Sequence, residues 1–405
     1  MGSLGIIIVN LRPKLNDPER MTKMKNRYLF LTVCLLVLYP VCAKALDDIK
    51  YGPWVTNVSE TSVTIVWMSN SPGVGYVELE DGERIYDMYA GRRNIDNLHT
   101  VRIKNLAKGS TLRYRVAGEL LNSYDDPYYP VFGESYCGKW YNVNTFDSSS
   151  SECHFSVIND IHLHTDEYTA LTRQIDTNNT GFIFLNGDII SANHYDVEKL
   201  ARFEIEPLGE YAHSMPVMFA RGNHEGRGNG IRNVAKIFPN DVSEGFYYTF
   251  REGPVAFIVF DGGETNAKRS RHYCGTEVYE QYMSEQIEWA RQAMDDSLFR
   301  NAPVKVCLAH VPMIDHPDQT EYHIQRWMNK HFVPMLSQAG IDLMIGADLH
   351  EYMYFERGTM QNDFPIFVND DRERLDCLYK DGMIVIRTYN PKGEMIRSAD
   401  IPIAF

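Results

Sequence analysis

The sequence has 405 residues, 44% of them hydrophobic and 23% charged, a composition typical of a globular protein with a large buried core. Its formal net charge is −14 at pH 7, which argues against nucleic acid or an anionic membrane as a binding partner. So acidic a chain is suited to cations, because a bound metal ion neutralises neighbouring carboxylates.

Residues 1–45 have the three parts of a secretory signal. Lys23, Lys25 and Arg27 precede the apolar run 28–41, and Ala43-Lys-Ala45 fits a cleavage site between small residues. The apolar run is shorter than the roughly 20 residues that a transmembrane helix needs. We therefore expect a signal peptide, a secreted or periplasmic protein, and no stable membrane span once residues 1–45 are removed.

Residues 46–147 are predicted to form an all-β domain. Four segments have strand length and many β-branched residues, with turn-forming residues between them: 62–68, 75–79, 99–103 and 111–116. This spacing favours a small β-sandwich. Aromatic residues crowd the segment 124–141, where they either form a surface on which a sugar or base stacks or, more commonly, pack against the next domain.

A serine-rich linker at 147–151 precedes a change of pattern, since strands alternate with helical segments from residue 152 onward. One helix is expected over 284–294, with Ser284 as its N-cap. A β-hairpin is expected over 382–397. The alternation predicts an α/β domain over residues 152–405.

Six apolar runs in this second domain are each followed by polar residues. The runs are 155–158, 182–186, 216–220, 255–260, 304–308 and 343–345, and each has the length and composition of a buried strand. Open α/β sheets keep their sites at the carboxyl ends of the strands, where such residues can converge. The residues that follow the runs are Asp160, His162, Asp188, Asn223, His224, Asp261, His310, Asp348 and His350.

Taken singly, each of these residues has an ordinary structural explanation, such as a turn, a helix cap or a core histidine. Together, carboxylates, imidazoles and one amide oxygen, without thiolates, suit ions such as Mn, Fe or Zn. They are too many for one tetrahedral ion and about enough for two, which can share a bridging carboxylate. Asp261 has no place in this arrangement and is expected to be structural.

The order of these motifs resembles that of the calcineurin-like metallophosphoesterases. The matching residues, over 153–350, are Asp160-x-His162, Gly187-Asp188, Gly222-Asn-His-Glu225, the strand-end His310 and a final x-x-His350. Ahead of them, Leu106, Gly109 and Tyr114 resemble a fibronectin type III strand corner, with Trp67 as the core tryptophan. The whole is similar to the purple-acid-phosphatase-related branch, which implies a four-layer αββα sandwich behind a fibronectin III-like β-sandwich.

The resemblance implies a role for each motif residue. Asp160, His162 and His350 would hold a first metal ion, Asp188 would bridge two ions, and Asn223, His310 and Asp348 would hold the second. His224 would protonate the leaving group, and Arg221, Arg227 and His316 could contact phosphate oxygens. The implied reaction is hydrolysis of a small phosphate monoester by a metal-bound hydroxide, with two divalent or trivalent ions (Fe, Mn or Zn) as cofactors.

Two positions depart from the family's pattern. Asp348 stands where the family usually has the first histidine of Gly-His-x-His. A carboxylate is a harder ligand than an imidazole, so the identity of the second metal ion is not predicted. Ser191 stands where purple members have an iron-binding tyrosine, so we expect no purple charge-transfer absorption. The alternatives are a phosphodiesterase or pyrophosphatase on the same scaffold, or a surface binding protein with a decayed metal site. The oligomeric state is not predicted.

Overall fold

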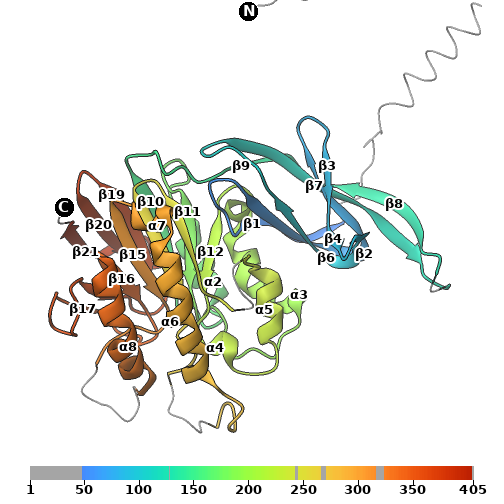
Figure 1. Ribbon diagram of the computed structural model, residues 1–405. Coiled ribbons are helices and arrows are strands. Elements are labelled where there is room, and N and C mark those ends of the chain that lie inside the picture. The colour runs from blue at the N-terminus through green and yellow to red at the C-terminus, as the bar shows by residue number, and fades with distance from the viewer. Residues whose placement is uncertain (1–47, 127, 242–244, 266–270, 316–322, 404–405) are drawn as a thin grey trace, which may run out of the picture. The chain divides into compact units, whose positions relative to one another are not determined.

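The computed structural model describes residues 48–403, except 127, 242–244, 266–270 and 316–322 (Figure 1). The predicted signal peptide over residues 1–45 lies outside the described residues. Within the described ranges, no helix is long and apolar enough to cross a membrane.

The first part of the chain contains strands and no helix among its described residues. The strands are β1 (Ile49–Thr56), β2 (Val63–Leu79), β3 (Arg84–Tyr86), β4 (Met88–Tyr89), β5 (Arg92–Arg93), β6 (Ile95–Ile103), β7 (Thr111–Ser123), β8 (Val131–Cys137) and β9 (Tyr141–Asn144). All except β4 and β5 belong to one seven-stranded antiparallel sheet. The all-β character agrees with the prediction, while the fibronectin type III likeness stays a prediction.

The long strand β2 connects this sheet. The sequence predicted two strands, 62–68 and 75–79, because the residues between them favour turns; the structure has one strand of 17 residues instead. Its first half pairs with β1 and its second half with β3 and β7, while β6 pairs with residues of both halves. A register shift between Met68 and Gly73 accommodates the irregular residues, as a β-bulge does.

From residue 153 the chain alternates strands and helices. The strands are β10 (Cys153–Ile158), β11 (Phe182–Asn186), β12 (Val217–Ala220), β13 (Tyr248–Glu252), β14 (Val255–Phe260), β15 (Val304–Ala309), β16 (Leu343–Gly346), β17 (Met353–Phe355), β18 (Ile366–Val368), β19 (Arg374–Lys380), β20 (Met383–Tyr389) and β21 (Met395–Pro402). The helices are α2 (Thr165–Thr172), α3 (Val197–Leu200), η1 (Ala201–Ile205), η2 (Glu206–His213), α4 (Asn223–Gly226), α5 (Ile231–Ile237), α6 (Tyr279–Asp295), α7 (Ser297–Arg300) and α8 (His323–Ala339). The six apolar runs are all strands, and β20 and β21 form the expected hairpin.

These strands form two six-stranded sheets, in the orders β12-β11-β10-β19-β20-β21 and β13-β14-β15-β16-β18-β17. In the first sheet β10, β11 and β12 are parallel to one another, and in the second β14, β15, β16 and β18 are parallel. The carboxyl ends of the parallel strands therefore share one edge in each sheet.

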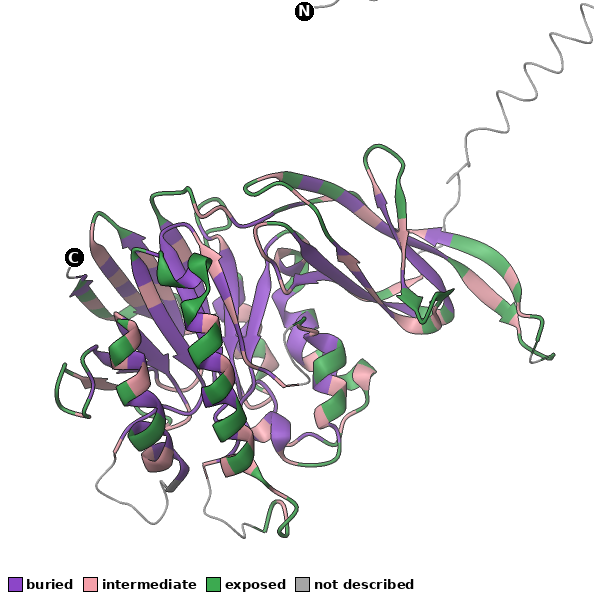
Figure 2. Ribbon diagram, viewed as in Figure 1, coloured by how far each residue is buried: buried purple, intermediate pink, exposed green. Residues whose placement is uncertain are grey.

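Side chains that alternate along the strands build four layers. Phe155 of β10 meets Phe257 of β14 with ring centroids 5.1 Å apart, in a core between the two sheets. On the outer faces, Ile158 packs in a cluster with Tyr168 of α2, and Ile258 in a cluster with Met283 of α6. Figure 2 shows the buried strands between helices whose outward faces are exposed. The helix–sheet–sheet–helix arrangement agrees with the predicted αββα sandwich.

The β region packs directly against the α/β region. Trp54 Nε1 donates to the carbonyl of Ile237 at 2.9 Å, and the Tyr114 hydroxyl donates to the carbonyl of His213 at 2.7 Å. In a tyrosine corner the hydroxyl bonds to backbone a few residues upstream, so Tyr114 does not play that part here. Residues 46–405 pack as one compact unit, and the domain boundary near residues 147–152 stays a prediction.

One local prediction is wrong, and a second holds only in part. Helix α6 begins at Tyr279, and Ser284 lies inside it, where its hydroxyl donates to the carbonyl of Glu280 at 2.7 Å instead of capping the helix. In the aromatic segment, the ring of Tyr141 packs against that of His213 in η2, with centroids 4.5 Å apart, as expected. Tyr124, Tyr128 and Tyr129 are 45%, 83% and 72% exposed, so they do not pack against the next domain.

Candidate metal centre

The predicted site residues lie in loops at the carboxyl ends of parallel strands from both sheets. Asp160 and His162 follow β10, Asp188 follows β11, Asn223 and His224 lie in α4 after β12, His310 follows β15, and Asp348 and His350 follow β16. The fold thus brings together residues that are far apart in the chain: the Nε2 atoms of His162 and His350, 188 positions apart, are 3.0 Å from each other.

The first group of ligand atoms surrounds Asp160 Oδ1. This oxygen lies 3.2 Å from His350 Nε2 and 3.6 Å from His162 Nε2. The three residues form one of the groups whose ligand atoms all lie within 4.8 Å of one another and could hold a metal ion.

The second group surrounds His310. Its Nε2 is 3.3 Å from Asp188 Oδ2 and 3.7 Å from Asp348 Oδ1. Asp188 Oδ2 also lies 3.9 Å from His162 Nε2, and Asp188 belongs to two of the groups that could hold an ion, one with Asp160 and His310 and one with His162 and His224. It therefore stands between the two sets of ligands, where a bridging residue has to be.

Three buried atoms in the site have no hydrogen-bond partner: Asp160 Oδ1, Asn223 Oδ1 and His310 Nε2. Such an atom costs roughly 1–3 kcal/mol when it stays unpaired. The opposite atom of each side chain is satisfied: Asp160 Oδ2 accepts from the Asp348 N–H at 3.1 Å, Asn223 Nδ2 donates to Glu264 at 3.1 Å, and His310 Nδ1 donates to the Asn186 carbonyl at 2.6 Å. Each side chain is thus held from behind with a lone pair left over, as second-shell bonds do for metal ligands. The donor set fits two ions.

The backbone of the site is held in an unfavourable conformation. Asp160, His162, Asp188, Asp348 and His350 all have φ between +47° and +72°, the left-handed region. For residues other than glycine this costs about 1–3 kcal/mol each and is concentrated at functional sites. Five such residues around one pair of clusters indicate that side-chain placement has been favoured over local stability.

Glycine is required at position 187, between the end of β11 and Asp188. Its φ is +77°, and a Cβ at this position would lie 2.5 Å from the backbone nitrogen of Gly222 and 2.7 Å from His310 Nδ1. Only glycine lets Asp188 approach His310 and the loop after β12 this closely.

Glu225 supports the loop that carries Asp188, a role that the sequence did not reveal. Its buried carboxylate accepts the N–H groups of Asp188, Ile189 and Gly222, each at 2.9 Å, and that of Ile190 at 3.4 Å. The signal was its place in the Gly-Asn-His-Glu motif, which also contains Gly222. The partners in the Asp188 loop lie more than thirty residues earlier and could not be identified from the sequence.

His224 and Arg227 lie together beside the metal ligands. The Nδ1–H of His224 donates to the Ser191 carbonyl, and its Nε2 is 3.8 Å from Asp188 Oδ2 and 2.5 Å from a guanidinium nitrogen of Arg227. Arg227 also forms a two-pronged salt bridge with Glu264 at 2.7 and 2.8 Å. Desolvation lowers the pKa of His224, and the charge of Arg227 lowers it further against the opposing effect of Asp188.

The sequence also predicted phosphate contacts for Arg221 and His316. Arg221 is 1% exposed and forms a bidentate salt bridge with Asp261, so its expected contact with phosphate is wrong. The same pair bears out the structural interpretation of Asp261. His316 lies outside the described residues.

The carboxyl of Asp348 has an unusually high pKa for a candidate metal ligand. Burial raises the pKa of its carboxyl to about 8, and the negative charges of Asp188 and Asp160 add to this effect against the attraction of His310. Its Oδ2 accepts from Gln325 Nε2 at 3.2 Å, a further partner that the sequence did not indicate. A nearby cation would favour its ionised form.

Comparisons with known proteins agree with this geometry. Residues 154–352 match the calcineurin-like phosphoesterase family, so this chain contains a calcineurin-like phosphoesterase domain. The fold is similar to that of the purple acid phosphatase PPD1 from yellow lupin (Lupinus luteus) seeds, with a TM-score of 0.63 and 14% identity over 87% of this chain and 74% of that one. It is also similar to GAP50, the anchor in the inner membrane complex of Plasmodium, with a TM-score of 0.48 and 14% identity over 63% of this chain and 90% of that one. No curated protein sequence matches the chain.

Proposed function

We propose that this protein is an exported, metal-dependent phosphoesterase that hydrolyses small phosphate monoesters. The observation that carries the proposal is the convergence of two sets of oxygen and nitrogen ligands on Asp188, with buried lone pairs on Asp160, Asn223 and His310 that no protein group satisfies. The phosphoesterase domain over residues 154–352 supports the reaction class.

The ligand sets would be Asp160, His162 and His350 for one ion and Asn223, His310 and Asp348 for the other, with Asp188 shared. Two bound cations would supply a water of lowered pKa and offset the charge of the phosphate group. The Ser191 carbonyl holds the Nδ1–H of His224, so Nε2 is the ring nitrogen that faces the site. His224 can donate a proton from Nε2 to the departing oxygen once this nitrogen has taken up a proton and no longer accepts from Arg227. Arg227 is held beside that nitrogen by Glu264 and can orient a phosphate oxygen.

Replacement of the shared ligand tests this proposal. We expect Asp188→Asn to lower kcat on p-nitrophenyl phosphate by on the order of 10³-fold or more, because removal of a key electrostatic group commonly costs that much. Metal content should fall below two ions per chain while the circular dichroism spectrum stays unchanged. Wild-type turnover that survives exhaustive chelation would show that the mechanism is wrong.

Preference for monoesters is a finer part of the proposal and needs its own experiment. The ligands treat mono- and diesters alike, so the choice depends on surrounding side chains such as Arg227, whose charge suits the dianionic group of a monoester. Kinetics on p-nitrophenyl phosphate and bis(p-nitrophenyl) phosphate should favour the monoester, and Arg227→Gln should reduce that preference. A higher kcat/KM on the diester would reassign the protein to the phosphodiesterases.

Export is supported by the signal-like residues 1–45 alone. N-terminal sequencing of the mature protein should find a new terminus close to residue 46. Retention of residues 1–45 in the mature chain would contradict export by cleavage.

A further inference from the structure

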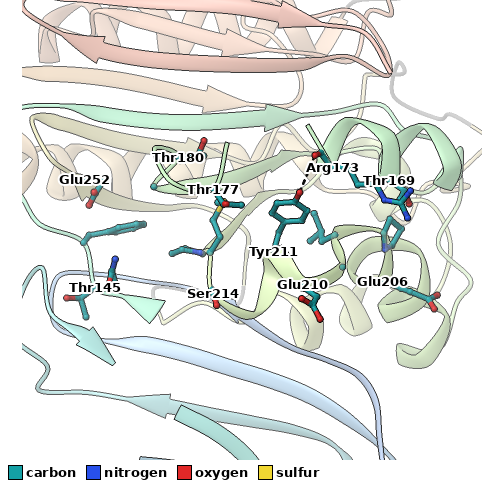
Figure 3. A pocket seen from close by; sticks show the side chains of 18 residues that line it. Thr145, Thr169, Arg173, Thr177, Thr180, Glu206, Glu210, Tyr211, Ser214 and Glu252 are labelled. Carbon is teal, nitrogen blue, oxygen red and sulfur yellow. Dashed lines mark hydrogen bonds between the residues drawn. The ribbon is translucent and has the colours of Figure 1, made fainter. Parts of the chain in front are cut away.

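A cavity lies at the end of the first sheet opposite the end that leads to the metal centre, and Figure 3 shows the side chains that line it. Gly181 and Pro216, which line it, directly precede β11 and β12, whose other ends lead to Asp188 and Asn223. Its volume is about 740 Å³, within the usual range of small-molecule sites. Its walls come from the end of β9 and from α2 and η2, so it lies where the β region meets the α/β region, a common position for such sites. The proposed phosphoesterase reaction does not use it.

The cavity offers many hydroxyl groups. The side chains of Thr169, Thr177, Thr180 and Ser214 line it, and none of them makes a hydrogen bond to another described residue. Each hydroxyl can donate one hydrogen bond and accept others. Thr180 is 8% exposed, and its side chain contributes to the wall of the cavity.

Charged side chains on the wall of the cavity come close to balancing one another. Glu206, Glu210 and Glu252 line it together with one cation, Arg173. Glu210 Oε1 lies 3.7 Å from Lys139 Nζ, and burial raises the pKa of Glu252 to about 7, so this carboxyl is largely protonated below that pH. Glu252 Oε2 accepts the Asp147 N–H at 3.0 Å, which leaves Oε1 available to a ligand. Within the described part of the chain, none of these carboxylates belongs to a group that could hold a metal ion. Such a wall suits a neutral organic molecule with many hydrogen-bonding groups.

An aromatic ring stands in the middle of the cavity. Figure 3 shows Tyr211 with Glu206 and Glu210 on one side and Thr177 and Arg173 on the other, its hydroxyl bonded to the Arg173 carbonyl at 3.2 Å. The ring packs in part against the hydrophobic cluster that contains Leu208, and the part that stays accessible can contact a ligand. An aromatic face combined with hydroxyl and carboxylate groups matches a ligand with one apolar ring face and many hydroxyl groups.

We propose that this cavity binds a saccharide unit. The saccharide could be a free sugar, or it could be the first unit of a glycan on Asn178 if the host glycosylates proteins. Asn178-Asn-Thr180 is an acceptor sequence, Asn178 is exposed, and Thr177 and Thr180 on either side of it line the cavity.

Binding of free sugars by unglycosylated full-length protein tests the proposal. Saturation-transfer NMR and calorimetry would use mannose, N-acetylglucosamine and N,N′-diacetylchitobiose. We expect at least one of them to bind with a Kd of about 1 mM or tighter. Ser214→Trp, which places a large side chain at an exposed position of the cavity, should weaken binding about tenfold or more. Failure of all three sugars to bind, or binding that Ser214→Trp leaves unchanged, would overturn the proposal.

Two controls keep the result specific. Ser135→Trp puts the same side chain at an exposed position on β8, away from the cavity lining, and should bind sugar as the wild type does. Both tryptophan variants should keep the unfolding midpoint of the wild type.

A further comparison distinguishes a free sugar from a glycan on Asn178 as the source of the saccharide. Protein from a glycosylating host is compared with its Asn178→Gln variant. Stronger sugar binding by the variant shows that the glycan occupies the cavity, and equal binding assigns it to free saccharide.

Discussion

At the scale of single residues, Asp348 decides whether the second ion site is complete. Its Oδ1 lies 3.7 Å from His310 Nε2, and its carboxyl is too buried to ionise readily unless a cation is near. If it is a ligand, Asp348→Ala should reduce the metal content from two ions per chain toward one. Asp348→His should restore two ions and shift the preference toward Zn, because an imidazole nitrogen is a softer ligand than a carboxylate.

Elemental analysis of the purified variants measures both outcomes. Asp363→Ala, at an exposed aspartate away from the site, is the matched control and should keep the wild-type metal content. Full metal content in Asp348→Ala would mean that Asp348 is not a ligand. A wild-type chain that holds no metal would favour the binding-protein alternative.

We expect Glu225 to be as important for activity as a metal ligand, although its carboxylate binds backbone N–H groups and not an ion. Glu225→Gln replaces an oxygen that accepts backbone N–H groups with an amide that donates, so at least one buried N–H is left unpaired. We expect a loss of about 1–3 kcal/mol in the free energy of unfolding and a fall in kcat, because the Asp188 turn loosens. Urea denaturation measures the free energy of unfolding, and p-nitrophenyl phosphate turnover measures kcat. Glu285→Gln, on the exposed face of α6, is the control. Unchanged turnover in Glu225→Gln would show that the turn holds without the carboxylate.

At the scale of elements, the buried pair of Arg221 and Asp261 connects the loop after β12 to the end of β14. Both side chains are 1% exposed, and α6 holds Asp261 through Gln286, which bonds both its N–H and its carbonyl. Asp261→Ala leaves a buried guanidinium unpaired, so we expect a loss of about 3–5 kcal/mol in the free energy of unfolding.

Denaturant unfolding measures this loss against a surface pair. Arg291 and Glu288 are 60% and 71% exposed, and Glu288→Ala should change the stability by less than about 1 kcal/mol. Equal effects of the two substitutions would mean that Arg221 finds another partner in the variant.

The elements that the sequence predicted well are those whose signal is local. Runs such as 182–185 and 255–260 are apolar throughout because both faces of their sheets are covered, and they lie in strands of the structure. Ser284 failed as a helix cap because it lies on the exposed side of a helix that starts five residues earlier, where serine bonds to a carbonyl in the preceding turn. The length of β2 was missed because its bulge is supported by β6 and β7, which the local sequence does not contain.

In the candidate metal centre, too, local signals could be predicted from the sequence and contacts between distant residues could not. The meeting of Asp160 with Asp188 was predictable, because both follow parallel strands of one sheet, whose carboxyl ends share an edge. His310 follows β15 of the other sheet, so its place beside them also depends on how the two sheets pack. The supporting partners were not: Gln325 reaches Asp348 from α8, and Glu264 reaches Arg227 from the loop after β14. Nothing in a single sequence marks such pairs, because the first contact depends on how α8 packs on its sheet and the second on how the two sheets pack.

At the scale of the whole molecule, Glu252 makes stability depend on pH at the junction of the β region with the α/β region. It ends β13 and accepts the N–H of Asp147, in the segment that joins the two regions. Burial raises its pKa to about 7 from the 4.5 of a free side chain, and the charges of Asp147 and Glu60 add to this shift. Between these two values the folded chain binds more protons at this residue than the unfolded chain does, so folding becomes less favourable as the pH rises.

We therefore expect Glu252 to lower the free energy of unfolding by up to about 3 kcal/mol between pH 5 and pH 8. Glu252→Gln keeps an oxygen for the Asp147 N–H and removes the titration, so the variant should lose less stability over this range than the wild type and be more stable at pH 8. Urea denaturation at both pH values measures the difference. Glu134→Gln, at an exposed glutamate on β8, should show the wild-type pH dependence. Because all other titrating groups are the same in both proteins, only the difference between wild type and variant is assigned to Glu252. Identical pH dependences would show that this carboxyl ionises in the folded chain as it does in water.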